Sequence, residues 1–223
     1  MKQRSILSAS VSLVLATTPV AASTTTSDLM VKGSISPGAA CTVSIGNTLS
    51  LGTIRRDRLN ADPTQPTTDL EEHRVTTAVN CPRARRFAFV VREAGGQDAS
   101  EPLAFTMRGE ASGTSPGKLF LLFDTQSTKI EGSQGYATAA SGTTNLEQAT
   151  WGPATSPREN LPITNGRYAV GFVTEAASTS APGNIKDLSV VLLVRPWIKP
   201  LNELDLSAAV GFSSDLGLEI NYF

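Results

Sequence analysis

Apolar and polar residues alternate along much of the chain in short stretches with a period of two, and no segment has a helical period. Such alternation, together with many β-branched residues, is typical of strands that bury one face. Gly, Pro, Ser and Asn cluster between these stretches, which indicates turns. The pattern predicts an all-β fold, either a β-sandwich or a barrel. Its expected strands are Leu29–Ile35, Thr42–Leu51, Val75–Cys81, Phe87–Arg92, Pro102–Met107, Lys118–Phe123, Tyr168–Thr174, Leu188–Val194, Leu206–Phe212 and Leu216–Phe223.

Three segments interrupt this pattern. Arg55–Arg74 is polar and holds two prolines, so we expect a loop that crosses between sheets. Thr125–Asn160 is rich in Ser, Thr, Gly and Ala, which predicts a long excursion with weak strands. Arg195–Leu204 contains Pro196 and Pro200, which would interrupt a strand or confine it to a sheet edge. No internal repeat or linker is apparent, so the sequence favours one domain.

The N-terminal residues have the pattern of a secretory signal peptide. Lys2 and Arg4 precede the short apolar run Ile6–Leu15, and a small-x-small motif ends at Ala22. We therefore expect residues 1–22 to be removed on export. The alternative is a membrane anchor, but this run is too short to cross a bilayer. No later apolar run is long enough either, so we expect no transmembrane span in the mature chain.

The chain has two cysteines and one histidine, with a formal net charge of −1. Cys41 and Cys81 lie 40 positions apart, and export to an oxidising compartment predicts that they pair. The alternative is a pair of free, buried thiols. Two cysteines and one histidine cannot complete a four-ligand zinc site, so we expect no metal and no cofactor. The near-neutral charge argues against binding to nucleic acid.

The sequence offers little for catalysis. His73, the only histidine, stands in a polar stretch that predicts a solvated loop, and no Gly-x-Ser-x-Gly motif occurs. We therefore expect no enzymatic activity. Trp151 and Trp197 could stack on a sugar, but packing is the favoured interpretation. The basic residues form two clusters, which we interpret as solvated loop ends rather than a binding patch: Arg55, Arg56 and Arg58, and Arg83, Arg85 and Arg86.

The C-terminal stretch has the clearest alternation in the chain. One face of this predicted strand carries Leu216, Leu218, Ile220 and Tyr222. An outer-membrane barrel would instead place lipid-facing residues in phase with the terminal Phe223. Those positions are occupied by Asn221, Glu219, Gly217 and Asp215, so the barrel alternative is disfavoured.

Five features of the chain belong together: Val31–Ile35, Ala39–Cys41, the Gly52–Ile54 segment, Cys81 and the penultimate Tyr222. They resemble the subunits of chaperone–usher fimbriae. More narrowly, the chain is similar to a poorly characterised family of fimbrial-like proteins with a Lys-Gly-x-Ile…Ala-Cys opening. The interval from Gly33 to Cys41 has one residue more than the opening of that family.

The resemblance implies an incomplete immunoglobulin-like β-sandwich over residues 32–223, completed by a donor strand from a partner. It implies a structural subunit, assembled by donor-strand exchange, that supports adhesion at the cell surface. The implied partners are a periplasmic pilus chaperone, an outer-membrane usher and neighbouring subunits. The subunit would pass through the periplasm to the fimbrium. Strand Leu216–Tyr222 would pair with these partners, and a chaperone would hold the carboxylate of Phe223.

Residues 23–31 are the candidate donor strand of the chain itself, because Leu29 and Val31 would fill pockets from one face. The alternative for this short, polar segment is a disordered N-terminus. A different class of function also stays open, namely a periplasmic or outer-membrane-associated binding module whose β-sandwich is complete. A secreted hydrolase is a third and weaker alternative.

Overall fold

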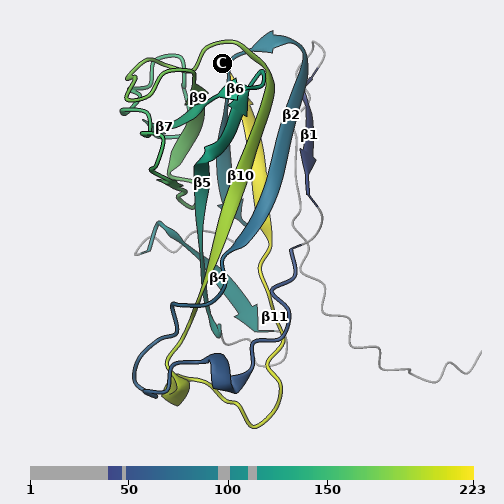
Figure 1. The fold of residues 1–223 in the computed structure, drawn as a ribbon, viewed down its shortest axis with the longest axis vertical. Coiled ribbons are helices and arrows are strands. Elements are labelled where there is room, and N and C mark those ends of the chain that lie inside the picture. The colour runs from purple at the N-terminus through teal and green to yellow at the C-terminus, as the bar shows by residue number, and fades with distance from the viewer. Residues whose placement is uncertain (1–39, 47–48, 95–100, 110–114) are drawn as a thin grey trace, which may run out of the picture.

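The computed structural model describes residues 40–46, 49–94, 101–109 and 115–223 (Figure 1). Within these ranges the regular elements are strands and two short 3₁₀ helices, η1 (Arg56–Arg58) and η2 (Leu201–Glu203), so the predicted all-β class is confirmed. The strands are β1 (Thr42–Ile45), β2 (His73–Arg85), β3 (Phe87–Glu93), β4 (Ala104–Gly109), β5 (Gly117–Ile130), β6 (Ser133–Gln134), β7 (Tyr136–Ser141), β8 (Leu161–Pro162), β9 (Tyr168–Val173), β10 (Ile185–Ile198), β11 (Phe212–Ser213) and β12 (Leu216–Tyr222).

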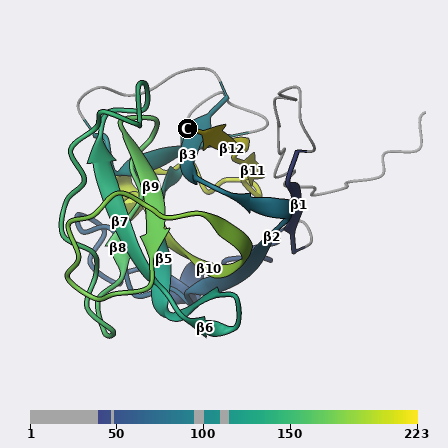
Figure 2. The ribbon, with the colours of Figure 1, turned by 90° about the horizontal axis from the view of Figure 1, so that it is seen from above.

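The strands form two antiparallel sheets. The larger has the order β1-β2-β10-β5-β4-β11, and β6 and β8 also pair with β5. The smaller has the order β12-β3-β9-β7. Figure 1 shows β7 and β9 beside the upper half of the long strands, whereas β4 and β11 lie in the lower half. The larger sheet curls into a half-barrel, as the view in Figure 2 shows.

The core lies between the two sheets and is built on aromatic rings. Phe89 of β3 lies 5.9 Å from Phe123 of β5 and 5.5 Å from Phe172 of β9, measured between ring centroids. All three are fully buried. Burial of such large side chains is the main favourable term in folding, and the stacked pair with Phe123 and the edge-on pair with Phe172 add to it. These contacts hold the two sheets face to face.

Strand β3 has a continuous apolar sequence because both of its faces are covered. Phe87, Phe89 and Val91 belong to the core between the sheets. Ala88 and Val90 belong to a second buried cluster, together with Leu146 and Trp151 from the excursion that follows β7. That Ser/Thr/Ala-rich excursion therefore covers the outer face of the smaller sheet.

The structure extends three predicted strands: Val75–Cys81, Lys118–Phe123 and Leu188–Val194 are parts of the longer β2, β5 and β10. Two other predicted strands are too long. The strand expected over Thr42–Leu51 ends at Ile45, and the strand expected over Leu206–Phe212 is reduced to β11. Residues 207–211 are Ser, Ala, Ala, Val and Gly, which offer little side-chain area to pack on a sheet. The predictions for Leu29–Ile35, for the signal peptide and for residues 23–31 lie outside the described residues.

The prediction for Arg195–Leu204 is that its prolines interrupt a strand or confine it to a sheet edge, and at Pro196 the structure shows the second outcome. Strand β10 runs through Pro196 and pairs there with Leu119 of β5. On its other side, the pairing with β2 ends at Val194, and the next bonds are those that Ile198 exchanges with Thr67. Hydrogen bonding alternates along β10, so the nitrogen of Pro196 faces the same side as the N–H of Ile198. Between Val194 and Ile198, the structure describes no strand on that side. The missing N–H therefore breaks no ladder bond, and the strand continues.

Candidate functional site

The predicted disulfide between Cys41 and Cys81 is present. It joins the start of β1 to β2, next to the pair formed by Thr42 and Asn80. The backbone N–H of Cys41 also donates a hydrogen bond to the hydroxyl of Tyr222, at 3.1 Å. The same short segment is therefore tied to the larger sheet by a covalent bond and to the end of β12 by a hydrogen bond.

Strand β12 buries the face that the sequence pattern predicts. Its exposed fractions are 5% at Leu216, 3% at Leu218 and 7% at Ile220. Tyr222 is half-buried, with its ring 6.5 Å from that of Phe87. The strand pairs with β3 along its whole length, from Leu216 opposite Glu93 to Tyr222 opposite Phe87. The C-terminal strand is thus an integral part of the core.

The other edge of β12 carries backbone groups that point away from β3. Hydrogen bonds flank the ladder from Ala94 N–H to the Asp215 carbonyl (3.0 Å) and from Phe223 N–H to the Arg86 carbonyl (3.2 Å). Because bonding alternates along an antiparallel pair, the odd-numbered residues face β3. The N–H and C=O groups at positions 216, 218, 220 and 222 face the opposite edge. Among the described strands, β12 pairs with β3 alone.

The terminal Phe223 packs on the outer side of the smaller sheet. Its ring stacks on Trp151 at 5.7 Å, and the guanidinium of Arg86 lies 5.4 Å from the ring centroid. Arg86 is held by a 3.1 Å hydrogen bond from its Nε to the Pro182 carbonyl. This contact holds the end of β12 in place. Trp151 is buried in this cluster, in agreement with the packing interpretation.

The remaining residues that suggested chemistry are scattered. His73 is the first residue of β2 and pairs with Val194, so its predicted place in a loop is wrong. Trp197 is half-buried, with the ammonium of Lys118 5.5 Å from its ring centroid.

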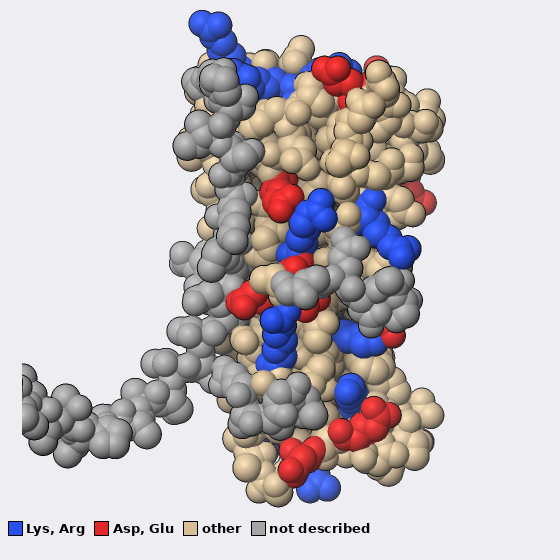
Figure 3. All heavy atoms as spheres, turned by 180° about the vertical axis from the view of Figure 1, so that it is seen from behind, with Lys and Arg blue, Asp and Glu red and all other residues tan. Residues whose placement is uncertain are grey.

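Figure 3 shows acidic and basic side chains interspersed over one face. In the part of the chain that the structure describes, no group of three His, Cys, Asp or Glu side chains could hold a metal, and no helix is long and apolar enough to cross a membrane.

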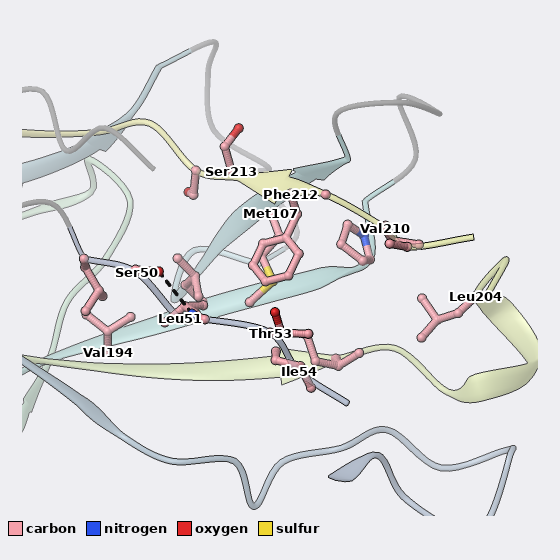
Figure 4. Close-up of a pocket in the computed structure, with 18 of the residues that line it drawn as sticks. Ser50, Leu51, Thr53, Ile54, Met107, Val194, Leu204, Val210, Phe212 and Ser213 are labelled. Carbon is pink, nitrogen blue, oxygen red and sulfur yellow. Dashed lines mark hydrogen bonds between the residues drawn. The ribbon is translucent and has the colours of Figure 1, made fainter. Parts of the chain in front are cut away.

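An apolar cleft of about 710 Å³ opens beside the start of β12 (Figure 4). Its floor is part of the larger sheet, and its walls are Leu49–Ile54 and residues 206–214. Part of each wall, Leu49–Leu51 and Leu206–Phe212, belongs to a segment that the sequence pattern predicted as a strand. Sequence reasoning therefore missed the cleft, and the small residues at 207–211 are the one signal in its favour. The lining residues from the sheet floor are Val75, Met107, Leu119, Leu121, Leu192, Val194 and Ile198.

Comparison of the chain with protein-family models, with curated proteins and with solved structures gives no match.

Proposed function

We propose that this protein is a structural subunit of chaperone–usher fimbriae, assembled by donor-strand exchange and supporting adhesion at the cell surface. In this proposal the two sheets form an immunoglobulin-like sandwich that a partner's strand completes. The partners are a periplasmic pilus chaperone, an outer-membrane usher and neighbouring subunits. The chain is exported, passes through the periplasm and ends in the fimbrium.

The observation that carries this proposal is the edge of β12. Alternate residues place their side chains in the core and direct their backbone N–H and C=O groups away from β3. An edge of this kind is a template for an added strand, in which main-chain hydrogen bonds provide the affinity. Leu216, Leu218 and Ile220 would set the register of the incoming strand.

The contact between Cys41 and Tyr222 supports the same reading. Among the described strands, β1 is one end of the larger sheet and β12 is one end of the smaller. The 3.1 Å hydrogen bond brings the start of the β1 segment within reach of the end of β12. A strand added to β12 on this side would extend the smaller sheet toward β1. The added strand would come from the next subunit and would carry that subunit's Leu29 and Val31.

A second candidate function is a periplasmic or outer-membrane-associated binding module with a complete sandwich. One observation favours it: the inward side chains of Leu216, Leu218 and Ile220 are already at most 7% exposed. A strand whose core face is covered has less to gain from a partner. The two candidates differ in whether a partner uses the free edge of β12, the edge that faces away from β3 and that pairs with no described strand.

Ile220→Pro tests the proposal without removing the strand. The N–H of Ile220 points away from β3, so proline leaves the β3 ladder intact but removes a donor from the free edge. Ile220→Ala is the matched control because it loses similar packing and keeps the N–H. Each variant would be co-expressed in the periplasm with a pilus chaperone and purified through the chaperone.

We expect Ile220→Ala to co-purify like the wild type and Ile220→Pro to bind about 5- to 150-fold more weakly, since one unsatisfied hydrogen bond costs about 1–3 kcal/mol. Equal recovery of both variants would contradict strand addition at this edge. A wild-type chain that stays monomeric and ignores the chaperone would favour the binding module. Thermal unfolding of each purified variant checks that both fold alike.

A further inference from the structure

The apolar cleft is distinct from the free edge of β12. Leu216 is the one residue of that strand that lines it. The floor comes from β2, β4, β5 and β10 of the larger sheet. Figure 4 shows Leu51, Ile54, Met107 and Phe212 around the same space. A volume of about 710 Å³ lies within the usual range for small-molecule sites, which are mostly apolar with few polar groups.

The charge at the cleft has one sign. Arg56 is the one charged side chain among the described lining residues, and no Asp or Glu lines the cleft there. Arg56 is exposed at the start of η1. Its neighbour Arg55 is paired with Asp57 at 3.0 Å. The guanidinium of Arg56, in contrast, makes no ion pair or hydrogen bond with a described residue. The cleft thus combines an apolar interior with one uncompensated cation.

The other polar side chains that line the cleft carry hydroxyl groups. Ser50 and Thr53 line one wall, and Ser207 and Ser213 line the other. Ser214 also lines the cleft, and its hydroxyl is buried with no hydrogen-bond partner in the described part of the chain. Because this hydroxyl has almost no accessible surface, it does not face a molecule in the cleft, and Arg56 is the charged side chain that can meet a headgroup.

We propose that the cleft binds a single-chain amphiphile with an anionic headgroup, of the long-chain carboxylate type. The aliphatic chain would lie on the apolar floor, where burial of each methylene is favourable. The carboxylate would meet the guanidinium of Arg56 through charge-assisted hydrogen bonds. This inference does not depend on the proposed fimbrial function, because it uses the cleft and leaves the edge of β12 free.

Dodecanoate and 1-dodecanol are matched probes, since they share a chain and differ in headgroup charge. Their binding to the purified full-length protein would be measured by isothermal titration calorimetry. We expect dodecanoate to bind more tightly than dodecanol in the wild type. Arg56→Ala should weaken dodecanoate binding about fivefold, the effect of one partly exposed ion pair, and leave dodecanol unchanged.

Arg58→Ala is the control for the lost positive charge, because Arg58 lies on the same turn and does not line the cleft. It should leave both affinities unchanged. Ala209→Trp places an indole at an exposed position of the wall and should abolish binding of both probes.

Three results would overturn the proposal: no saturable binding of dodecanoate, equal effects of Arg56→Ala and Arg58→Ala, or unchanged binding in Ala209→Trp. Competition of a peptide of residues 23–31 with dodecanoate would assign the cleft to a strand instead. None of these results bears on Ile220→Pro, so the two proposals fail separately.

Discussion

Asp124 shows how one carboxylate shapes a strand. Its side chain is 8% exposed and is paired with Arg74. It accepts hydrogen bonds from the hydroxyl of Ser127 at 2.7 Å and from the N–H of Gln126 at 3.0 Å. Both bonds lie in the irregular part of β5, which runs from Asp124, opposite Val191, to Lys129, opposite Ser189. The carboxylate therefore gives the backbone N–H of Gln126 a partner within this irregular part of the strand.

Burial alone would raise the pKa of Asp124. Hydrogen bonds from Ser127 and Arg74, the charge of Arg74 and the bond from Gln126 outweigh burial and lower the pKa below its ordinary value. The unfolded chain, with a pKa of about 3.9, thus binds more protons than the folded chain in acid. The stability contributed by this ionisation is complete above about pH 5 and is lost as the pH falls through the lower, folded pKa.

We predict that Asp124→Asn destabilises the protein near neutral pH and that its difference from the wild type shrinks as the pH falls below about 4. Urea unfolding between pH 3 and 7 measures this difference. Asp57→Asn is the control, since the ion pair of Asp57 is exposed and should contribute little at any pH. A difference between Asp124→Asn and the wild type that does not vary with pH would contradict the assigned role.

At the scale of elements, the close approach of β5 to β10 depends on Gly117. A Cβ at this position would lie 2.1 Å from the carbonyl oxygen of Trp197. Gly117 also pairs with Met107 of β4, so it stands where three strands meet. The glycine is required here for space between backbones, and neither neighbouring strand can move without breaking its ladder.

Gly117→Ala should therefore destabilise the protein by about 1–3 kcal/mol, the usual range for overpacking. Gly183→Ala is the matched control, because a Cβ at Gly183 meets no atom within 4 Å. Thermal unfolding followed by circular dichroism gives both values. A melting temperature for Gly117→Ala equal to that of the control would show that the strands can separate at no cost.

At the scale of the whole molecule, the disulfide is the one covalent link between distant parts of the described chain. It closes an interval of 40 positions and fixes the start of β1 on β2. Through the Cys41 N–H and the Tyr222 hydroxyl, it also connects the larger sheet to the end of the smaller one.

The double variant Cys41→Ser/Cys81→Ser should lose about 4 kcal/mol of unfolding free energy on the chain-entropy model. Urea unfolding of the variant and of the oxidised wild type gives the difference. Tyr222→Phe serves as the comparison, since it removes the hydrogen bond alone and should cost about 1 kcal/mol. If reduction of the wild type leaves its unfolding midpoint unchanged, the disulfide contributes nothing to stability.

Local pattern was enough to predict part of this architecture. Alternation predicted β12 and its inward face, because every second residue of a strand shares a side. β-branched and aromatic content predicted the central parts of β2 and β10 and the first half of β5. The pairing of Cys41 with Cys81 followed from their number and from the compartment that the N-terminal pattern implied.

The sequence by itself thus determined the all-β class, the disulfide and the core face of the last strand, because each depends on residue type or on a period of two. Only the tertiary structure decided the course of β10 through Pro196, the cleft and the place of Arg56 beside it. These features depend on which strands are neighbours and on where each ladder ends. Such contacts join residues far apart in the chain, and no local pattern encodes them.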